Sequence, residues 1–125
     1  MKLVDTSAWI EFLRERESNA ADRVEELLGA GEAGWCDLIA TELWNGARGE
    51  KERKALQELE EAVTLFPLDS AAWQQAKVLA QKCRQAGVTV PTVDLVVAAC
   101  AFRHGLEIEH HDKHFGVIQA VWRRP

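Results

Sequence analysis

Short apolar runs alternate with longer helical patterns along this chain, and this alternation constrains the fold more than any other feature. The first run, residues 2–4, ends at Asp5 and is followed by helical apolar spacing over residues 9–13. Further apolar runs over 33–36 and 106–110 also adjoin helical patterns. Such alternation favours helices packed on a mainly parallel sheet. We therefore expect an α/β layered fold.

The remaining helical patterns follow one another without a low-complexity linker. They cover residues 19–28, 37–47, 50–62, 71–86 and 91–104. The last apolar stretch, 116–122, predicts a strand, either alone or after a short helix. A chain of 125 residues corresponds to about one domain. We expect a single domain over residues 1–125.

The composition is that of an ordinary globular protein, and it narrows the classes of function. Hydrophobic residues make up 47% of the chain and charged residues 28%. The longest apolar run, residues 95–102, is far shorter than the roughly 18 residues of a membrane span. Residues 1–7 lack a signal-peptide pattern, so we expect a cytoplasmic protein without membrane contact. With a net charge of −5, binding to nucleic acid needs basic patches or metal ions.

The cysteines give no indication of a disulfide framework or a zinc ribbon. Cys36, Cys83 and Cys100 are an odd number without close spacing. We expect them to be buried thiols that behave as small hydrophobic side chains.

Four of the acidic residues stand at positions that suggest a site. Asp5 and Asp112 each follow an expected strand, so both should lie at the carboxyl edge of a parallel sheet, where ligands bind. Asp94 lies in a very apolar helix, and Glu42 lies between apolar residues of another. Singly, capping, the helix dipole or plain exposure would explain each of them. One shared site explains all four together.

Carboxylates that converge on one spot repel each other unless cations lie between them. Oxygen ligands select Mg²⁺ or Mn²⁺, and one or two such ions would activate water against a phosphodiester. The pattern therefore indicates metal-dependent phosphoryl-transfer hydrolysis.

Three histidines surround Asp112 and suggest a competing zinc site. His110, His111 and His114 have only His104 as a further histidine, however, and zinc needs three or four converging nitrogen or sulfur ligands. Zinc is therefore disfavoured. His111 or His114 would instead bind the scissile phosphate or tune a water molecule, unless both are simply exposed.

Four ordered blocks, "LVDTSAWI", "ATELWNGA", "PTVDLVVAACAFRHG" and "HHDKHFGVI", resemble the signature blocks of PIN-domain ribonucleases. More narrowly, the whole chain resembles the VapC toxins of bacterial toxin–antitoxin pairs. The resemblance implies a three-layer α/β/α fold with about five strands. It also implies an acidic metal pocket formed by Asp5, Glu42, Asp94 and Asp112, and Mg²⁺- or Mn²⁺-dependent endonucleolytic cleavage of RNA, with tRNA or rRNA loops as typical targets. A homodimer and a VapB-like antitoxin are the implied partners.

The same resemblance indicates supporting residues around the pocket. Thr6 and Ser7 match hydroxyl positions of which one supports a ligand or holds a water molecule, although helix capping explains them at least as well. His114 stands where many relatives carry an acidic or basic residue, so a fifth carboxylate is missing.

Two further surfaces are suggested for RNA and for the antitoxin. The basic residues expected to contact RNA phosphates, unless they only decorate a solvated surface, are Arg48, Lys51, Lys113 and Arg123. The apolar residues that would line an antitoxin groove, unless they are core residues, are Trp9, Phe12, Leu43 and Trp44.

Other functions fit the sequence less well. An aspartate-dependent phosphatase usually has a second acid two residues after the first, where Ser7 stands here. A receiver-like module needs an acidic pair that is missing. A PIN fold that only binds RNA or a partner is the main alternative to the nuclease.

Overall fold

The sheet is parallel throughout, and all of its strands are short. The computed structural model describes residues 1–124, and in this part of the chain the strands are β1 (Lys2–Val4), β2 (Ala33–Trp35), β3 (Thr64–Leu65) and β4 (Glu107–Glu109). Their order is β3-β2-β1-β4. Leu3 pairs with Gly34 on one side and with Ile108 on the other. The carboxyl ends of β1 and β4, which precede Asp5 and Asp112, are therefore neighbours.

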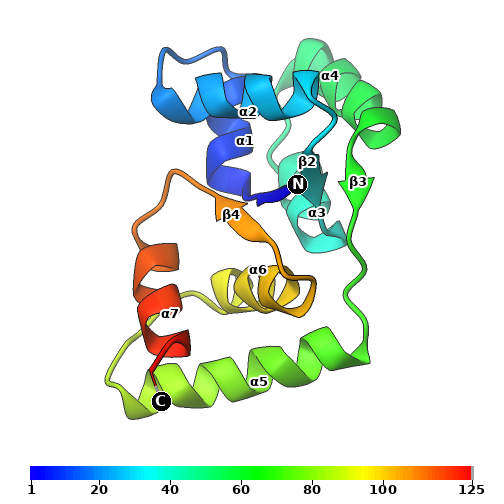
Figure 1. Cartoon of the computed structure of the whole chain (residues 1–125). Coiled ribbons are helices and arrows are strands. Elements are labelled where there is room, and N and C mark those ends of the chain that lie inside the picture. The colour runs from blue at the N-terminus through cyan, green and yellow to red at the C-terminus, as the bar shows by residue number, and fades with distance from the viewer. Residues whose placement is uncertain (125) are drawn as a thin grey trace.

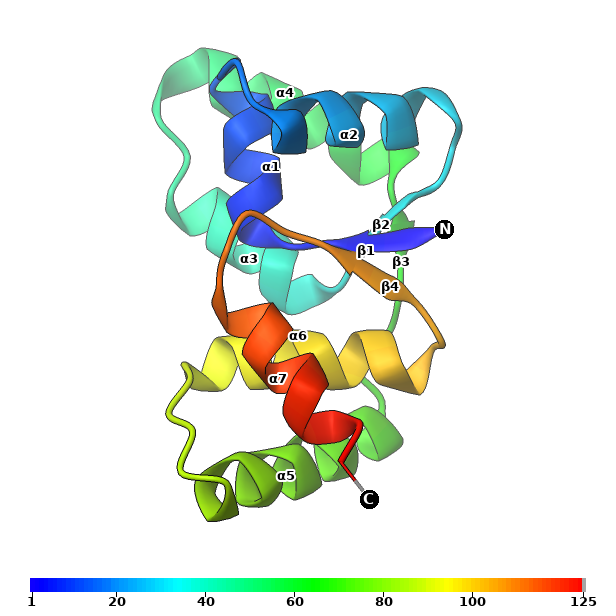
Figure 2. The same ribbon diagram turned by 60° about the vertical axis from the view of Figure 1, so that its left-hand side comes forward.

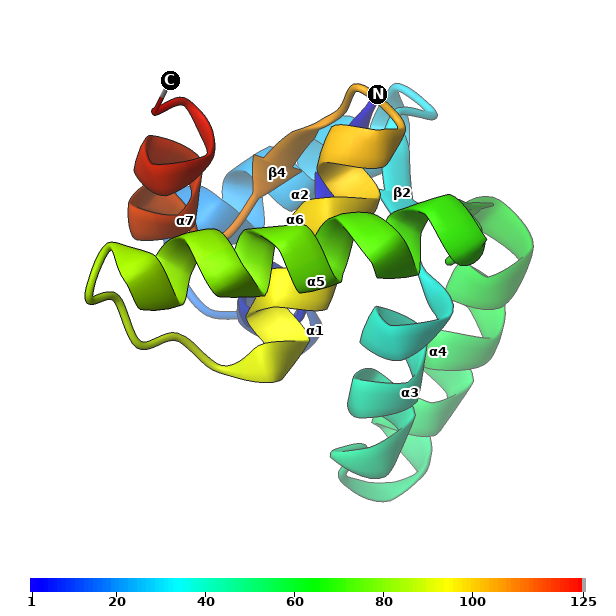
Figure 3. The same cartoon turned by 90° about the horizontal axis from the view of Figure 1, so that it is seen from below.

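Helices cover both faces of this sheet. In residues 1–124 they are α1 (Thr6–Leu13), α2 (Asn19–Gly29), α3 (Asp37–Asn45), α4 (Gly49–Ala62), α5 (Ser70–Gln85), α6 (Thr92–Arg103) and α7 (His114–Trp122). Figures 1 and 2 show α1 and α2 on one side of the sheet, and α6 with α5 beyond it on the other. In Figure 3, α5 crosses α6, while α3 and α4 run side by side away from them. The expected three-layer α/β/α fold is confirmed.

The prediction of a strand over residues 116–122 is wrong, and it explains why the described sheet has four strands rather than five. Residues 114–122 form α7, and Phe115, Ile118 and Val121 are its buried residues. Their spacing of three places them on one helical face, which packs against α5 and α6. A short apolar run does not by itself distinguish a strand from a buried helix.

The core lies between the sheet and the helical layers. Trp9 and Trp35 are fully or almost fully buried and meet edge to face, with ring centroids 5.7 Å apart. Gly34 is required in β2 because a Cβ atom there would lie 2.4 Å from the ring of Phe66. Cys36, Cys83 and Cys100 are buried free thiols, as expected.

Two expectations concern the whole chain: the absence of a membrane span, and a single domain. No helix formed by residues 1–124 is long and apolar enough to cross a membrane. The single domain expected over 1–125 includes Pro125, which lies outside the described residues.

Candidate metal centre

Four separate segments bring acidic side chains toward the carboxyl edge of the sheet. Asp5 directly follows β1 and is the N-cap of α1, and its backbone N–H donates to the carbonyl oxygen of Glu109 at 2.9 Å. Asp112 lies in the loop between β4 and α7. Asp94 lies in the first turn of α6, and Glu42 lies on α3. Asp5 and Asp112, which are far apart in the sequence, thus lie at the same edge because β1 and β4 pair.

The tightest cluster consists of Asp94, Asp112 and His114. One ligand atom from each lies within 4.8 Å of the others. His114 Nδ1 is 3.0 Å from Asp94 Oδ2 and 2.9 Å from Asp112 Oδ1. The backbone N–H of His114 also donates to Asp112 Oδ1 at 2.6 Å. The start of α7 therefore holds Asp112 in place and directs His114 toward Asp94.

Asp5 and Glu42 are each held by a hydroxyl group from the first turn of α1. Ser7 donates to Asp5 Oδ2 from its Oγ at 2.8 Å and from its backbone N–H at 3.1 Å. Thr6 Oγ1 donates to Glu42 Oε1 at 2.8 Å. Thr6 and Ser7 thus orient carboxylates, while the cap of α1 is Asp5 itself. The capping alternative for the two hydroxyl residues is not what the structure shows.

Burial and mutual repulsion make the ionised carboxylates of this cluster unfavourable. Burial raises the pKa of Asp94 to about 6, and the charges of Asp112 and Asp5 add to the increase. Burial also raises the pKa of Asp5, which is only 3% exposed, despite its hydrogen bonds from Ser7. The folded chain therefore concentrates more negative charge here than its own cations neutralise.

These residues fit a divalent cation. Asp94 Oδ2 and His114 Nδ1 are buried without a hydrogen-bond partner among the described residues. Carboxylate oxygens are the ligands that Mg²⁺ and Mn²⁺ prefer, and a cation would relieve the repulsion that raises the pKa of Asp94. Asp94 and Asp112 are the residues that would hold it, together with Asp5 at the same edge.

Glu11 is a buried carboxylate that the sequence patterns did not single out. It is 6% exposed, and its Oε2 accepts from Arg16 at 2.7 Å, while His111 Nε2 lies 3.5 Å from Oε1. The backbone N–H of His111 donates to Ser7 Oγ at 2.9 Å. Glu11 therefore steadies the loop that carries Asp112. Its position four residues after Ser7, on the same helical face, could have identified it.

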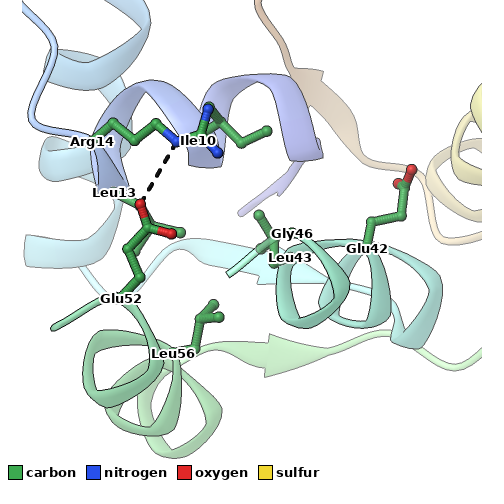
Figure 4. Close-up of a pocket in the computed structure, with 8 residues that line it drawn as sticks. All are labelled: Ile10, Leu13, Arg14, Glu42, Leu43, Gly46, Glu52 and Leu56. Carbon is green, nitrogen blue, oxygen red and sulfur yellow. Dashed lines mark ion pairs between the residues drawn. The ribbon is translucent and has the colours of Figure 1, made fainter. Parts of the chain in front are cut away.

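A small cavity opens next to Glu42 between α1, α3 and α4. Its volume is about 30 Å³, and it is lined by Ile10, Leu13, Arg14, Glu42, Leu43, Gly46, Glu52 and Leu56. Figure 4 shows the ion pair between Arg14 and Glu52, 3.6 Å apart, at one end and Glu42 at the other. We call this feature the α1/α3/α4 cavity.

The prediction that Trp9 lines an antitoxin groove is wrong. Its side chain is 0% exposed and belongs to the core. Leu43 is also largely buried but lines the α1/α3/α4 cavity. Phe12 and Trp44 are half-buried, and Trp44 Nε1 donates to Glu60 at 3.0 Å.

The basic residues predicted to contact RNA are all exposed, but they do not form one patch. Arg48 and Lys51 line a hollow of about 370 Å³ that shares Leu13, Arg14 and Glu52 with the α1/α3/α4 cavity. Lys113 directly follows Asp112, and Arg123 is the C-cap of α7. Arg48 and Lys51 therefore adjoin the α1/α3/α4 cavity, and Lys113 adjoins the acidic cluster.

Comparison with known proteins agrees with this architecture. The PIN domain family model matches residues 2–120. Ribonuclease VapC11 from Mycobacterium tuberculosis is 36% identical, and the match covers 97% of this chain and 93% of that protein. Among solved structures, FitAcB from Neisseria gonorrhoeae superposes with a TM-score of 0.74 at 20% identity, over 99% of this chain and 100% of that chain. VapBC-5 from M. tuberculosis, a member of the VapBC family of toxin–antitoxin systems, gives 0.69 at 21% identity, over 94% and 89%.

The structural matches support the fold, and the sequence matches support a closer relationship. A family model that spans nearly the whole chain and a full-length relative at 36% identity lead to the same assignment. The chain belongs to the PIN-domain family and, within it, to the VapC ribonucleases.

Proposed function

We propose that this protein is a metal-dependent endoribonuclease that acts as the toxin of a toxin–antitoxin pair. The observation that carries the proposal is the convergence of Asp5, Asp94 and Asp112 at one sheet edge, where burial and repulsion raise the pKa of Asp94 to about 6. Such a site binds a divalent cation, for which we propose Mg²⁺ or Mn²⁺, one or two ions. The name of the relative, Ribonuclease VapC11, supports RNA as the substrate.

A bound ion supplies Lewis acidity, which activates water and stabilises charge that develops on the scissile phosphate. The protein contributes the geometry. Ser7 holds Asp5 through its hydroxyl and backbone N–H, Thr6 holds Glu42, and the start of α7 holds Asp112. These hydrogen bonds hold each carboxylate in a fixed orientation, so that none needs to rearrange during the reaction.

The exposed basic residues are the proposed contacts to RNA phosphates. Lys113 stands next to Asp112, whereas Arg48 and Lys51 stand beyond the α1/α3/α4 cavity. These groups would position the strand without reading its bases. Arg123, at the end of α7, is a weaker candidate because it lies farther along the chain from Asp112.

For the antitoxin we propose a VapB-like peptide that binds across the α1/α3/α4 cavity. Ile10 and Leu13 provide half-buried apolar surface beside the buried Leu56, and Glu42 stands at the other end of the cavity from Arg14 and Glu52. A helix or an extended tail with an apolar side chain at this place would block access to Glu42. The likeness to VapBC-5, a member of a toxin–antitoxin family, supports a partner of this kind. A homodimer and a cytoplasmic location complete the proposal.

The decisive experiment incubates the purified protein, free of any antitoxin, with structured RNA in Mg²⁺, in Mn²⁺ or in EDTA. Asp5→Asn and Asp94→Asn are assayed beside the wild type, with circular dichroism to confirm folding. We expect cleavage with either metal, none in EDTA, and none in the variants. Cleavage that persists in EDTA or in both variants contradicts the mechanism. RNA binding without cleavage under every condition would identify a binding module instead.

A separate experiment tests the toxin role. Expression of the chain alone should arrest growth of a bacterial host, and co-expression of the small gene beside its own should relieve the arrest. Normal growth with the folded protein present in quantity contradicts the toxin assignment and leaves the nuclease assignment untouched.

A further inference from the structure

His114 places a ring nitrogen between two carboxylates of the metal centre. Its Nδ1 lies 3.0 Å from Asp94 Oδ2 and 2.9 Å from Asp112 Oδ1. In the described chain, neither Nδ1 nor Asp94 Oδ2 has a partner with hydrogen-bond geometry, although both atoms are buried. Both contacts are short, but neither has the alignment of an N–H···O hydrogen bond. The nitrogen is directed into the same space as the carboxylate oxygens.

The position of this ring is fixed by the start of α7. The backbone N–H of His114 donates to Asp112 Oδ1 at 2.6 Å, and the next residue, Phe115, is 0% exposed. Because Phe115 is anchored in the core, the first turn of α7 has little freedom to rotate. His114 is thus oriented by the fold and not by a chance surface contact.

The two spacings that involve His114 Nδ1 suit neighbouring ligands of one octahedral ion. Neighbouring ligands of an octahedron with metal–ligand distances of about 2.1 Å lie about 3.0 Å apart. The distances from His114 Nδ1 to the two carboxylate oxygens, 3.0 and 2.9 Å, have this value. All three atoms lie within 4.8 Å of one another. A single ion could contact all three after only a small adjustment of the carboxylates.

We propose that His114 is a direct nitrogen ligand of the metal, and that this ligand makes the centre prefer Mn²⁺ over Mg²⁺. The inference rests on the proposed metal-dependent function and specifies the ion. Mg²⁺ binds oxygen ligands and keeps its water molecules. Mn²⁺ also prefers oxygen ligands, but as a first-row transition-metal ion it accepts an imidazole nitrogen more readily than Mg²⁺ does. A site with two carboxylates and one imidazole is therefore better matched to Mn²⁺ than a site made only of carboxylates.

Electron paramagnetic resonance of the full-length protein tests this proposal with Mn²⁺ as the probe. Pulsed measurements on the Mn²⁺-loaded protein should show coupling to a ¹⁴N nucleus, which changes to the ¹⁵N pattern after labelling with ¹⁵N-histidine. The coupling should disappear in His114→Ala and persist in His111→Ala. The His111 variant is the matched control, because that imidazole belongs to the same loop but pairs with Glu11.

Competition between the two ions tests selectivity. In the wild type, Mg²⁺ should displace Mn²⁺ only at more than about a tenfold excess over the Mn²⁺ concentration, and His114→Asp should reduce this preference by about three- to tenfold. The aspartate variant retains a ligand, so it separates loss of selectivity from loss of folding, which thermal unfolding also checks.

The possible outcomes separate this inference from the proposed function. Metal-dependent RNA cleavage without nitrogen coupling overturns the role of His114 and leaves the nuclease intact. Nitrogen coupling that depends on His114, in a protein that cleaves no RNA, supports the ligand and contradicts the nuclease. Coupling that survives in His114→Ala, or no binding of Mn²⁺ at millimolar concentration, overturns the inference.

Discussion

The two sides of the acidic centre are built differently. On the side of α1 and α3, Asp5 and Glu42 each accept a hydrogen bond from a hydroxyl group. On the side of α6 and α7, Asp94 Oδ2 and His114 Nδ1 lack hydrogen-bond partners among residues 1–124 and face each other at 3.0 Å. The first side is organised by the protein alone, whereas the second presents unpaired ligand atoms that a cation would bind. The hydroxyl groups on the α1 and α3 side therefore orient carboxylates, whereas the α6 and α7 side supplies the free ligand atoms for an ion.

The largest effect is expected from Asp94→Asn, which removes a negative ligand from the α6 and α7 side. Because no other group compensates for the lost charge, cleavage of RNA should fall by more than about 100-fold in saturating Mn²⁺. This decrease is larger than the one that follows when a residue that only hydrogen-bonds to a metal ligand is removed. Single-turnover cleavage measures the rate. A variant that keeps most of its activity would show that the ion is held elsewhere. Glu58→Gln, an exposed change on α4, is the control.

A smaller effect is expected on the side that is organised by hydroxyl groups. Ser7→Ala removes the Oγ hydrogen bonds to Asp5 and from His111, whereas Thr6→Val removes one hydrogen bond to Glu42 and keeps the branched shape. Losing an orienting partner typically reduces metal affinity or activity by about 10- to 100-fold. We expect Ser7→Ala to approach the upper value and Thr6→Val the lower one.

Titration of Mn²⁺ and cleavage assays measure both changes. Thr89→Val, at an exposed position before α6, serves as a control for loss of a hydroxyl group. If Thr6→Val were the more damaging variant, Glu42 and not Asp5 would be the critical carboxylate on this side.

The pH dependence of stability provides a third test of the comparison. Because the pKa of Asp94 is raised from 3.8 to about 6 in the folded chain, folding favours its protonated form. The stability that protonated Asp94 gives to the folded chain is fully present below pH 3.8 and is lost as the pH rises through about 6. In EDTA, the free energy of unfolding of Asp94→Asn relative to the wild type should therefore increase by about 1–3 kcal/mol between pH 4 and pH 7.5.

Urea denaturation at the two pH values measures this difference, with Glu58→Gln as the reference for an exposed carboxylate. A pH-independent difference would show that Asp94 ionises as freely in the folded chain as in the unfolded chain. Excess Mn²⁺ should lower the stability of Asp94→Asn relative to the wild type at pH 7.5, because the ion binds only the folded wild type with full affinity.

The sequence was sufficient to predict the layers and the placement of Asp5 and Asp112 at one edge of the sheet, because both depend on local patterns. Asp5 and Asp112 follow apolar runs, so their meeting required only that the strands be parallel neighbours. The partner of Thr6 could not be read in this way, since Glu42 lies 36 residues away and the contact depends on how α1 packs against α3.

The C-terminal segment shows where local patterns are insufficient. The run 116–122 is too short for its period to decide between strand and helix, and the burial of Phe115 and Ile118 against α5 and α6 decides for a helix. That helix begins at His114, and its start directs the imidazole toward Asp94. The role of His114 therefore follows from tertiary packing, which the "HHDKH" pattern does not encode.

The smallest expected effect is on the affinity for RNA, which depends on the basic residues near each side of the acidic centre. Lys113 adjoins the α6 and α7 side, whereas Lys51 lies beyond the α1/α3/α4 cavity and pairs with Glu15 at 3.2 Å. Because Glu15 partly neutralises the charge of Lys51, Lys51→Ala should weaken binding of RNA by less than about twofold. Lys113→Ala should weaken it about three- to fivefold. Each phosphate contact that is lost should also lower the slope of log affinity against log salt by about 0.7 for single-stranded RNA.

Filter binding in EDTA at several salt concentrations measures both quantities without cleavage. Lys77→Ala, an exposed change on α5, is the control for loss of one positive charge. A larger loss for Lys51 than for Lys113 would place the strand along the α1/α3/α4 cavity. In that case RNA and the antitoxin would compete for the whole cavity and not only for the acidic centre.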